Sequence, residues 1–109
     1  MELCEEMKKL RKLLTEKGIE WHDESTIYTE DFIGMIKSTM PYFVDNSIYR
    51  THFDIDGIHY SVINGFGTYG GFDLIERKNY GLLECMIDDN EPVGWLSANN
   101  IMDMISKQV

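Results

Sequence analysis

The fold is decided by residues 49–62, which read YRTHFDIDGIHYSV. Apolar or β-branched side chains alternate with polar ones on both sides of the centre: Tyr49, Thr51, Phe53, Ile55, Ile58, Tyr60 and Val62. This period of two predicts two half-buried strands. Between them, Asp56-Gly57 is typical of a tight type I′ turn, because both central residues of that turn need a positive φ. The segment is therefore predicted to be a β-hairpin in which Ile55 pairs with Ile58.

The polar positions of this hairpin form a second pattern. With the turn at Asp56-Gly57, Asp54 stands directly opposite His59, and His52 lies diagonal to His59 on the same face. We interpret Asp54 and His59 as a surface charge pair. A metal site would need a third or fourth ligand, and acid–base catalysis would need a substrate cleft. We expect neither a metal nor a cofactor.

Helices are predicted at the two ends of the chain. Leu3, Met7, Leu10 and Leu14 recur at spacings of three and four, which predicts an amphipathic helix over about residues 2–17. Gly18 stands where a left-handed residue commonly ends a helix. Ser97 is a favourable cap for a last helix over about residues 98–107, with its buried side formed by Ile101, Met102, Met104 and Ile105.

Further strands are predicted at residues 82–87 and 93–96, and a short one at Ile19 to His22. The segment 22–47 has two interpretations, a loop or a short helix that begins after Thr29. Residues 1–109 are thus predicted to form one α+β domain. Its expected architecture is an antiparallel sheet of about four to five strands, with the N-terminal and C-terminal helices packed on one face.

Composition predicts a folded protein of the cytoplasm. The chain is 43% apolar and 12% aromatic, too rich in core-forming residues for a disordered chain. No apolar run is long enough to cross a membrane, and the acidic N-terminus lacks the features of a signal peptide. Cys4 and Cys85, far apart in the sequence, are expected to be free thiols in a reducing compartment, with Cys85 in the core.

Charge is distributed unevenly along the chain. Residues 1–17 carry five basic and four acidic side chains, whereas residues 18–109 carry five basic and fifteen acidic ones, for a net charge of −9. A surface of this kind repels nucleic acid and attracts basic proteins. Direct binding to nucleic acid or to a membrane is therefore not expected.

A glycine-rich segment, residues 65–71, contains Gly65, Gly67 and Gly70 in the spacing of a dinucleotide fingerprint. That fingerprint requires a helix directly after the glycines and a parallel sheet, and neither is predicted here. The segment is instead interpreted as a bulged turn. An alternative hypothesis is a small-ligand sensor or sequestering protein for a nucleotide-like molecule, with a pocket formed by Phe66, Gly67, Tyr69, Gly70 and the cation Arg77.

Three short segments of the C-terminal half carry a resemblance: residues 65–71, residues 81–84 and residues 92–98. Together they resemble small uncharacterised proteins that are encoded by phages and prophages of Gram-positive bacteria. The resemblance implies no established activity and no site residues. It implies a setting in which small acidic proteins, including inhibitors of bacterial defence nucleases, are common.

The leading hypothesis is a non-enzymatic, acidic binding protein of phage or mobile-element type. Its partner is expected to be a basic, nucleic-acid-handling protein, and its binding surface is predicted to contain Asp88, Asp89, Glu91, Tyr69, Asp54 and Asp56. Another hypothesis is a structural or assembly protein that associates with its own copy through the apolar stripe of the first helix. The expected state is a monomer or a weak homodimer.

Overall fold

The computed structural model describes residues 3–26, 48–65, 67–73, 75–76 and 78–108. Helix α1 (Glu5–Glu16) comes first and helix α3 (Ala98–Gln108) last. Between them, the described residues form seven strands: β1 (His22–Asp23), β2 (Ile48–Ile55), β3 (Ile58–Gly65), β4 (Phe72–Asp73), β5 (Lys78–Asn79), β6 (Leu83–Ile87) and β7 (Val93–Leu96). The helix considered after Thr29 lies outside the described residues.

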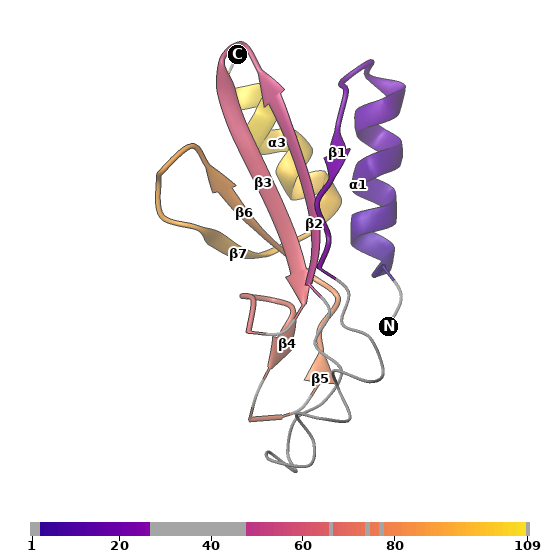
Figure 1. The fold of residues 1–109 in the computed structure, drawn as a ribbon, viewed down its shortest axis with the longest axis vertical. Coiled ribbons are helices and arrows are strands. Elements are labelled where there is room, and N and C mark those ends of the chain that lie inside the picture. Colours follow the sequence, from indigo (N-terminus) through magenta and orange to yellow (C-terminus); the bar gives the residue numbers. More distant parts are fainter. Residues whose placement is uncertain (1–2, 27–47, 66, 74, 77, 109) are drawn as a thin grey trace.

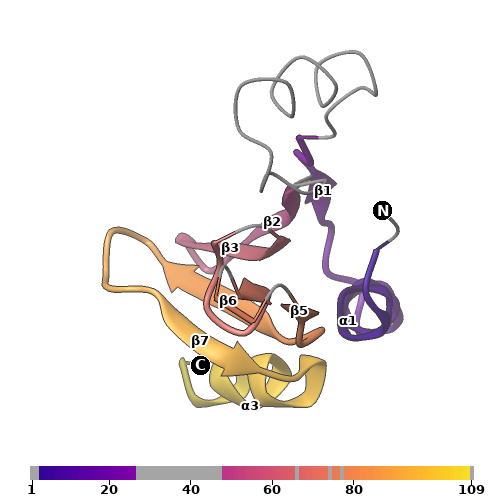
Figure 2. The same cartoon turned by 90° about the horizontal axis from the view of Figure 1, so that it is seen from below.

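Five strands form the main sheet in the order β1-β2-β3-β6-β7, and every neighbouring pair is antiparallel. Both helices lie on the same side of this sheet, α1 beside β1 and β2 and α3 below β6 and β7 (Figures 1 and 2). The predicted α+β architecture is therefore confirmed. Among the described residues, no helix combines the length and the apolar character that a membrane span requires.

The central hairpin has the predicted register. Ile55 pairs with Ile58 and Asp54 with His59. Asp56 and Gly57 have φ values of 52° and 82°, as a type I′ turn requires. The turn dipeptide and the period-two pattern thus determine together which side chains reach the core.

The core lies between the sheet and the two helices. Helix α1 contributes Met7, Leu10 and Leu14, each fully buried, and α3 contributes Ile101 and Ile105. The sheet contributes the inward side chains of the middle strands: Tyr49, Phe53, Tyr60, Val62, Leu83 and Cys85. The Phe53 and Tyr60 rings stack with their centroids 5.1 Å apart. Burial of each large apolar side chain contributes about 1.5–3 kcal/mol to the free energy of unfolding.

The helix ends follow the sequence signals. At the end of α1, Gly18 adopts a φ of 73°, and the amide of Ile19 donates to the Leu14 carbonyl at 2.9 Å. This is a Schellman motif. At the start of α3, the amide of Asn100 donates to Ser97 Oγ at 3.1 Å, and the amide of Ser97 donates to Asn100 Oδ1 at 2.9 Å. The predicted Ser97 cap is therefore present as a reciprocal capping box.

Two features of the fold differ from the prediction or were not predicted. Strand β1 occupies His22–Asp23 and so begins later than the expected strand at residues 19–22. Strands β4 and β5 form a separate two-stranded sheet beyond the end of β3. Asn64, buried in β3, joins the two sheets: its Nδ2 donates to the Leu82 carbonyl at 2.8 Å, and its Oδ1 accepts from Asn79 Nδ2 at 3.1 Å.

Candidate functional site

The glycine-rich segment folds into a tight loop that displays an aromatic side chain. Gly67 and Gly70 both adopt positive φ, and Thr68 Oγ1 donates to the Gly65 carbonyl at 2.8 Å. The loop then packs against strand β7, where a Cβ atom on Gly94 would lie only 2.9 Å from the carbonyl oxygen of Tyr69. The absence of a side chain at Gly94 therefore lets Tyr69 lie against the edge of the sheet.

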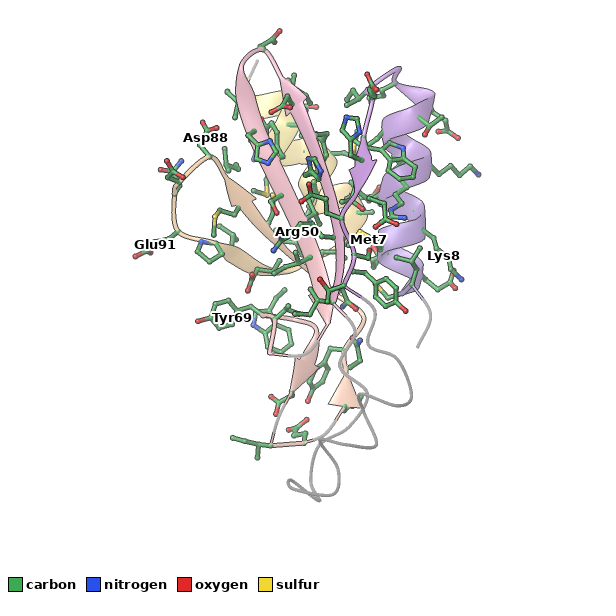
Figure 3. All side chains as sticks on the ribbon, in the orientation of Figure 1. Met7, Lys8, Arg50, Tyr69, Asp88 and Glu91 are labelled. Carbon is green, nitrogen blue, oxygen red and sulfur yellow. The ribbon has the colours of Figure 1, made fainter. Side chains whose placement is uncertain are left out.

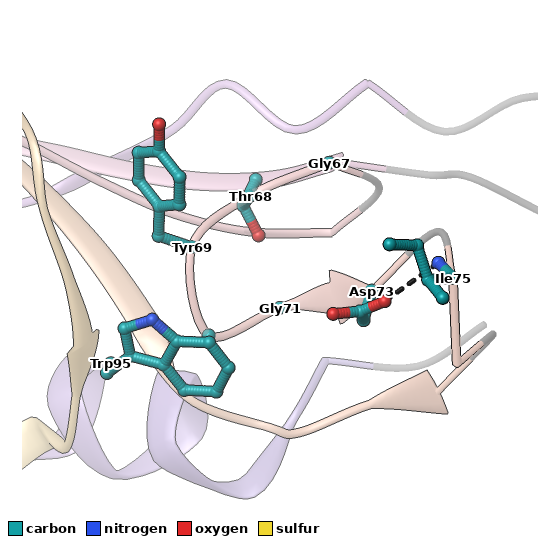
Figure 4. A pocket seen from close by; sticks show the side chains of 8 residues that line it. Gly67, Thr68, Tyr69, Gly71, Asp73, Ile75 and Trp95 are labelled. Carbon is teal, nitrogen blue, oxygen red and sulfur yellow. Dashed lines mark hydrogen bonds between the residues drawn. The ribbon is translucent and has the colours of Figure 1, made fainter.

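Among the described side chains of this region, Tyr69 and Trp95 are the exposed rings, with 59% and 55% of their surfaces accessible. The amide of Trp95 donates to the Tyr69 carbonyl at 3.2 Å, so the backbones of the loop and of β7 are tied together. Trp95 itself has a φ of 59°, a left-handed conformation that is uncommon for a side chain of this size. Its indole lies 5.3 Å from the Tyr80 ring, and Figure 4 shows it on the same side of the hollow as the Tyr69 phenol ring.

A hollow of about 290 Å³ lies beside these rings. Its described lining residues come from the glycine-rich loop, the β4 region and β7: Gly67, Thr68, Tyr69, Gly70, Gly71, Asp73, Ile75 and Trp95. Figure 4 shows Tyr69 and Trp95 on one side of the hollow and Asp73 on the other. The only charged group among these lining residues is the Asp73 carboxylate.

Asp73 is held in place by the chain that follows it. Its Oδ1 atom accepts the amides of Ile75 at 2.8 Å and Glu76 at 2.9 Å. Such a turn orders the carboxylate without neutralising its charge. The described lining of the hollow is thus aromatic on one side and anionic on the other.

Three amides of the loop, those of Thr68, Tyr69 and Gly71, are already engaged within the chain. Thr68 donates to the Gly65 carbonyl at 3.2 Å, Gly71 donates to the Thr68 carbonyl at 3.0 Å, and Tyr69 donates to Glu84 Oε1 at 3.0 Å. A phosphate site of the expected kind would need such amides to be free. Of the residues predicted for a ligand pocket, Gly67, Tyr69 and Gly70 do line the hollow. Phe66 and Arg77 lie outside the described residues.

The predicted acidic residues of the β6–β7 turn lie on the same side of the molecule as Tyr69 (Figure 3). Asp89 and Glu91 are exposed. Asp88 is exposed too, but it holds the neighbouring strand: its Oδ1 accepts the His59 amide at 2.8 Å, and its own amide donates to the His59 carbonyl at 2.7 Å. Asp88 therefore has a structural role that Asp89 and Glu91 do not share.

Asp54 and Asp56 lie apart from Tyr69, on the β2–β3 hairpin. Asp54 Oδ1 lies 2.8 Å from His59 Nδ1, so the predicted charge pair is present. Because His59 also contacts Asp88 through its backbone, it connects Asp54 with the β6–β7 turn. Asp54 and Asp56 also line a second hollow of about 350 Å³, together with Gly18, Ile19, Glu20, His22 and Ile55. The six predicted partner-binding residues thus occupy two neighbouring areas instead of one.

The three histidines form a row across the face of the sheet opposite to the two helices. The rings of His22 and His52 have centroids 5.3 Å apart, and those of His52 and His59 are 5.5 Å apart. Each ring faces a carboxylate: Glu20 for His22 at 3.9 Å, Glu24 for His52 at 3.2 Å and Asp54 for His59. Within the described part of the chain, no group of three or more His, Cys, Asp or Glu side chains is arranged to hold a metal ion.

Both cysteines are free thiols. Cys85 lies in the core, as predicted, and burial raises its pKa to about 12. Burial also raises the pKa of the half-buried Cys4. Neither thiol is therefore activated as a thiolate nucleophile at neutral pH.

The apolar stripe of α1 faces the core of its own chain. Met7, Leu10 and Leu14 have no exposed surface, and Leu3 packs against the same cluster. These side chains already pack inside one molecule, so they are not available as a surface for self-association.

Basic side chains are concentrated on α1, whereas the β6–β7 region on the other side of the molecule carries acidic side chains and no basic one. Of the eight described Lys and Arg residues, five lie on α1 or at its end: Lys8, Lys9, Arg11, Lys12 and Lys17. By contrast, β6, β7 and the turn between them contain four acidic residues and no basic one. Figure 2 places α1 and the β6–β7 turn on opposite sides. The basic residues of the first helix are thus separated in space from the acidic β6–β7 region.

Comparison with known proteins adds no relative to this picture. No family model, no curated protein and no solved structure matches the chain. The geometry and the charge of the site are therefore what a functional proposal has to rest on.

Proposed function

We propose that this protein is an acidic, non-enzymatic binding protein that attaches to a basic protein surface. The contact surface is the β7 margin, defined as Tyr69, Asp89, Glu91, Val93 and Trp95. One observation supports the proposal above all. These five side chains are exposed, and neither β6, β7 nor the turn between them contains a basic residue.

The composition of the β7 margin suits protein recognition. Tyr and Trp are the residues that most often supply large contributions to binding, because they bury much apolar area with few rotatable bonds. The carboxylates beside them add little affinity when they stay hydrated, but they steer a basic partner and raise its association rate. Tyr69 and Trp95 would thus anchor the complex, and Asp89 and Glu91 would orient it.

The partner proposed here is a protein that handles nucleic acid, such as a nuclease of bacterial defence. The basic groove of such a protein normally faces phosphates, and a small acidic protein can occupy it in their place. The sequence resemblance to small phage proteins points to the same kind of partner. The basic helix α1 would remain on the far side, away from the groove.

A charge-reversal experiment tests this proposal. The wild-type protein and the D89K/E91K variant are each immobilised and exposed to a bacterial lysate, and bound proteins are identified by mass spectrometry. Asp88 is left unchanged, because its carboxylate supports the His59 backbone. The affinity of the captured basic protein is then measured at low and high salt. We expect D89K/E91K to bind it at least about tenfold more weakly, with a flatter salt dependence.

The matched control is E5K/E16K. Glu5 and Glu16 are exposed acids on α1, which lies on the opposite side of the molecule from the β6–β7 turn, so this variant has the same change in net charge away from the β7 margin. The proposal predicts that it keeps most of the wild-type affinity. Equal losses in the two double variants, or an affinity that does not respond to salt, would contradict the proposal.

A further inference from the structure

We propose that the hollow between Tyr69, Trp95 and Asp73 receives one cationic side chain, a lysine or an arginine, of the basic partner. This inference rests on the proposed function and identifies the group that the β7 margin recognises. Three features of the hollow carry it: its aromatic side, its carboxylate and the absence of a basic residue among its described lining residues.

The aromatic side suits a cation. Tyr69 and Trp95 are both more than half exposed, and Figure 4 shows them on the same side of the hollow. The face of an aromatic ring is electron-rich and attracts an ammonium or a guanidinium within about 6 Å of its centroid, and Trp attracts most strongly. The methylene groups of a lysine or arginine would cover the apolar surface of the rings.

The carboxylate faces these rings from the other side. Asp73 uses only Oδ1 in its bonds to the amides of Ile75 and Glu76. Within the described part of the chain no hydrogen bond reaches its second oxygen. That oxygen can therefore accept a donor from a ligand, and a charged donor forms the stronger bond.

The molecule already holds one ammonium group against a ring of this region. Lys78 Nζ lies 4.9 Å from the centroid of Tyr80, and the Tyr80 ring lies 5.3 Å from that of Trp95. Lys78 is also the strand partner of Asp73, yet it forms no ion pair with it among the described residues. Among the described residues, the Asp73 charge therefore has no cationic partner, and the proposed ligand group would supply one.

The size and the charge of the hollow disfavour the nucleotide-like ligand of the alternative hypothesis. A volume of about 290 Å³ is at the lower limit of small-molecule pockets, which suits one side chain better than a nucleotide. Phosphate would also meet the Asp73 carboxylate, and the loop amides of Thr68, Tyr69 and Gly71 are already bonded within the chain.

Nuclear magnetic resonance of the whole ¹⁵N-labelled protein can test the inference, because the chain has only two indole N–H signals. The probes are N-acetyl-lysine methylamide, N-acetyl-arginine methylamide and the uncharged N-acetyl-norleucine methylamide. We expect the Trp95 signal to shift with one or both cationic probes and not with norleucine. Trp21 is the internal control: its Nε1 donates to Thr15 Oγ1 at 2.9 Å, and Arg11 already covers its ring at 4.7 Å.

Two variants separate the contributions of charge and ring. Asp73→Asn keeps an oxygen for the amides of Ile75 and Glu76 but removes the charge, and we expect it to weaken the cationic probes about tenfold. Asp103→Asn removes one exposed charge on α3 and should leave their affinity unchanged. Trp95→Leu should abolish the shifts that the cationic probes cause in the Tyr69 resonances. An unmoved Trp95 signal, equal effects of Asp73→Asn and Asp103→Asn, or equal binding of norleucine would overturn the inference.

The captured basic protein distinguishes this inference from the proposed function. If Asp73→Asn binds that protein as tightly as the wild type while D89K/E91K does not, the hollow does not receive a cationic side chain of the partner. The proposed function then still stands. If the wild type captures no basic protein, the proposed function fails, and the titration with the small probes still decides whether the hollow accepts a cation.

Discussion

Arg11 connects the first helix to the edge of the sheet through three acceptors. Its Nε donates to Thr51 Oγ1 at 2.7 Å, and its Nη2 lies 3.3 Å from both Asp23 Oδ1 and the Arg50 carbonyl. Its guanidinium also stacks on the Trp21 ring. Because Thr51 is a buried polar residue of β2, both roles of its hydroxyl are satisfied: its oxygen accepts from Arg11, and its proton is donated to Met7 Sδ at 3.2 Å.

A pH-dependent contribution to stability follows at Asp23. A hydrogen bond from the Ser25 hydroxyl and, less strongly, the charge of Arg11 lower the pKa of Asp23 below its ordinary value of 3.8. A carboxyl whose pKa is lower in the folded state stabilises the fold above the unfolded pKa, and this stabilisation is lost as the pH falls through the folded pKa. Asp23→Asn should therefore be less stable than the wild type at neutral pH, with a deficit that shrinks below about pH 4.

Urea unfolding of the wild type and Asp23→Asn at a series of pH values measures this difference. Asp103→Asn is the control, because the exposed Asp103 has no bonded partner among the described residues. A deficit of Asp23→Asn that stays constant from neutral to strongly acidic pH would show that the charge of Asp23 does not stabilise the fold.

Cys85 provides a second prediction at the scale of one residue. Only 1% of its surface is exposed, and burial raises its pKa to about 12. The thiol should therefore react with iodoacetamide only when the core opens, since alkylation requires an accessible thiolate. We expect labelling of Cys85, followed by mass spectrometry, to have the same urea dependence as global unfolding. Rapid labelling in the native state would contradict this placement of Cys85.

At the scale of elements, one helix caps the other. Helix α3 has no acidic residue in its first turn, and Glu6 of α1 takes that place: its Oε1 accepts the Ala98 amide at 2.8 Å. The carboxylate thus satisfies a free donor and interacts favourably with the positive end of the α3 dipole. This contact also fixes the two helices relative to each other on their shared face of the sheet.

Glu6→Ala should lower the free energy of unfolding by about 1 kcal/mol and increase amide exchange in the first turn of α3. Glu6→Gln keeps an acceptor and should lose less. Glu5→Ala serves as the control, because Glu5 forms only an exposed pair with Lys8 at 3.3 Å, and such pairs contribute little. Chemical denaturation and hydrogen exchange measure both effects. If Glu5→Ala and Glu6→Ala proved equally destabilising, the capping role would be refuted.

The elements that the sequence predicts well are those with local signals. The β2–β3 register follows from Asp56-Gly57, and the ends of the helices follow from Gly18 and Ser97, because each signal acts within a few residues. Strand β1 was placed too early, because its partner β2 lies more than twenty residues away and no local pattern determines their pairing. Strands β4 and β5 have two residues each, too few for a periodic signal, and are tied to the main sheet by Asn64 and Asn79.

The candidate site was predictable only in part for the same reason. The sequence indicated Tyr69 and the acids of the β6–β7 turn, which are exposed as expected. It did not indicate Trp95 or Asp73. These residues line one hollow only because the glycine-rich loop packs against Gly94. The only available signal was that Trp95 directly follows a glycine in a strand, a position where another backbone often approaches closely.

At the scale of the whole molecule, the separation of charge has a cost as well as a use. The β6–β7 region carries four acids and no basic residue on the side opposite to α1, and the net charge of the chain is −9. Like charges repel one another more in the compact state than in the unfolded chain, so this surface destabilises the fold while it favours a basic partner. Neutralisation by such a partner would remove the repulsion, and binding would then stabilise the protein by more than its contacts alone.

Salt should act on the free protein in the same direction. Screening at about 0.1 M salt limits interactions between exposed charges to about 10 Å, so the Tm of the wild type should rise between very low and moderate NaCl. D89K/E91K exchanges two negative charges for two positive ones, which changes the net charge from −9 to −5, and its Tm should rise less. Thermal unfolding of both proteins in a NaCl series measures the difference. A Tm that rises equally in both would reflect a general effect of salt, whereas a Tm that falls in the wild type would mean that favourable ion pairs outweigh the repulsion. Either result would show that repulsion within the acidic surface does not destabilise the free protein, so that a basic partner would have no such repulsion to relieve.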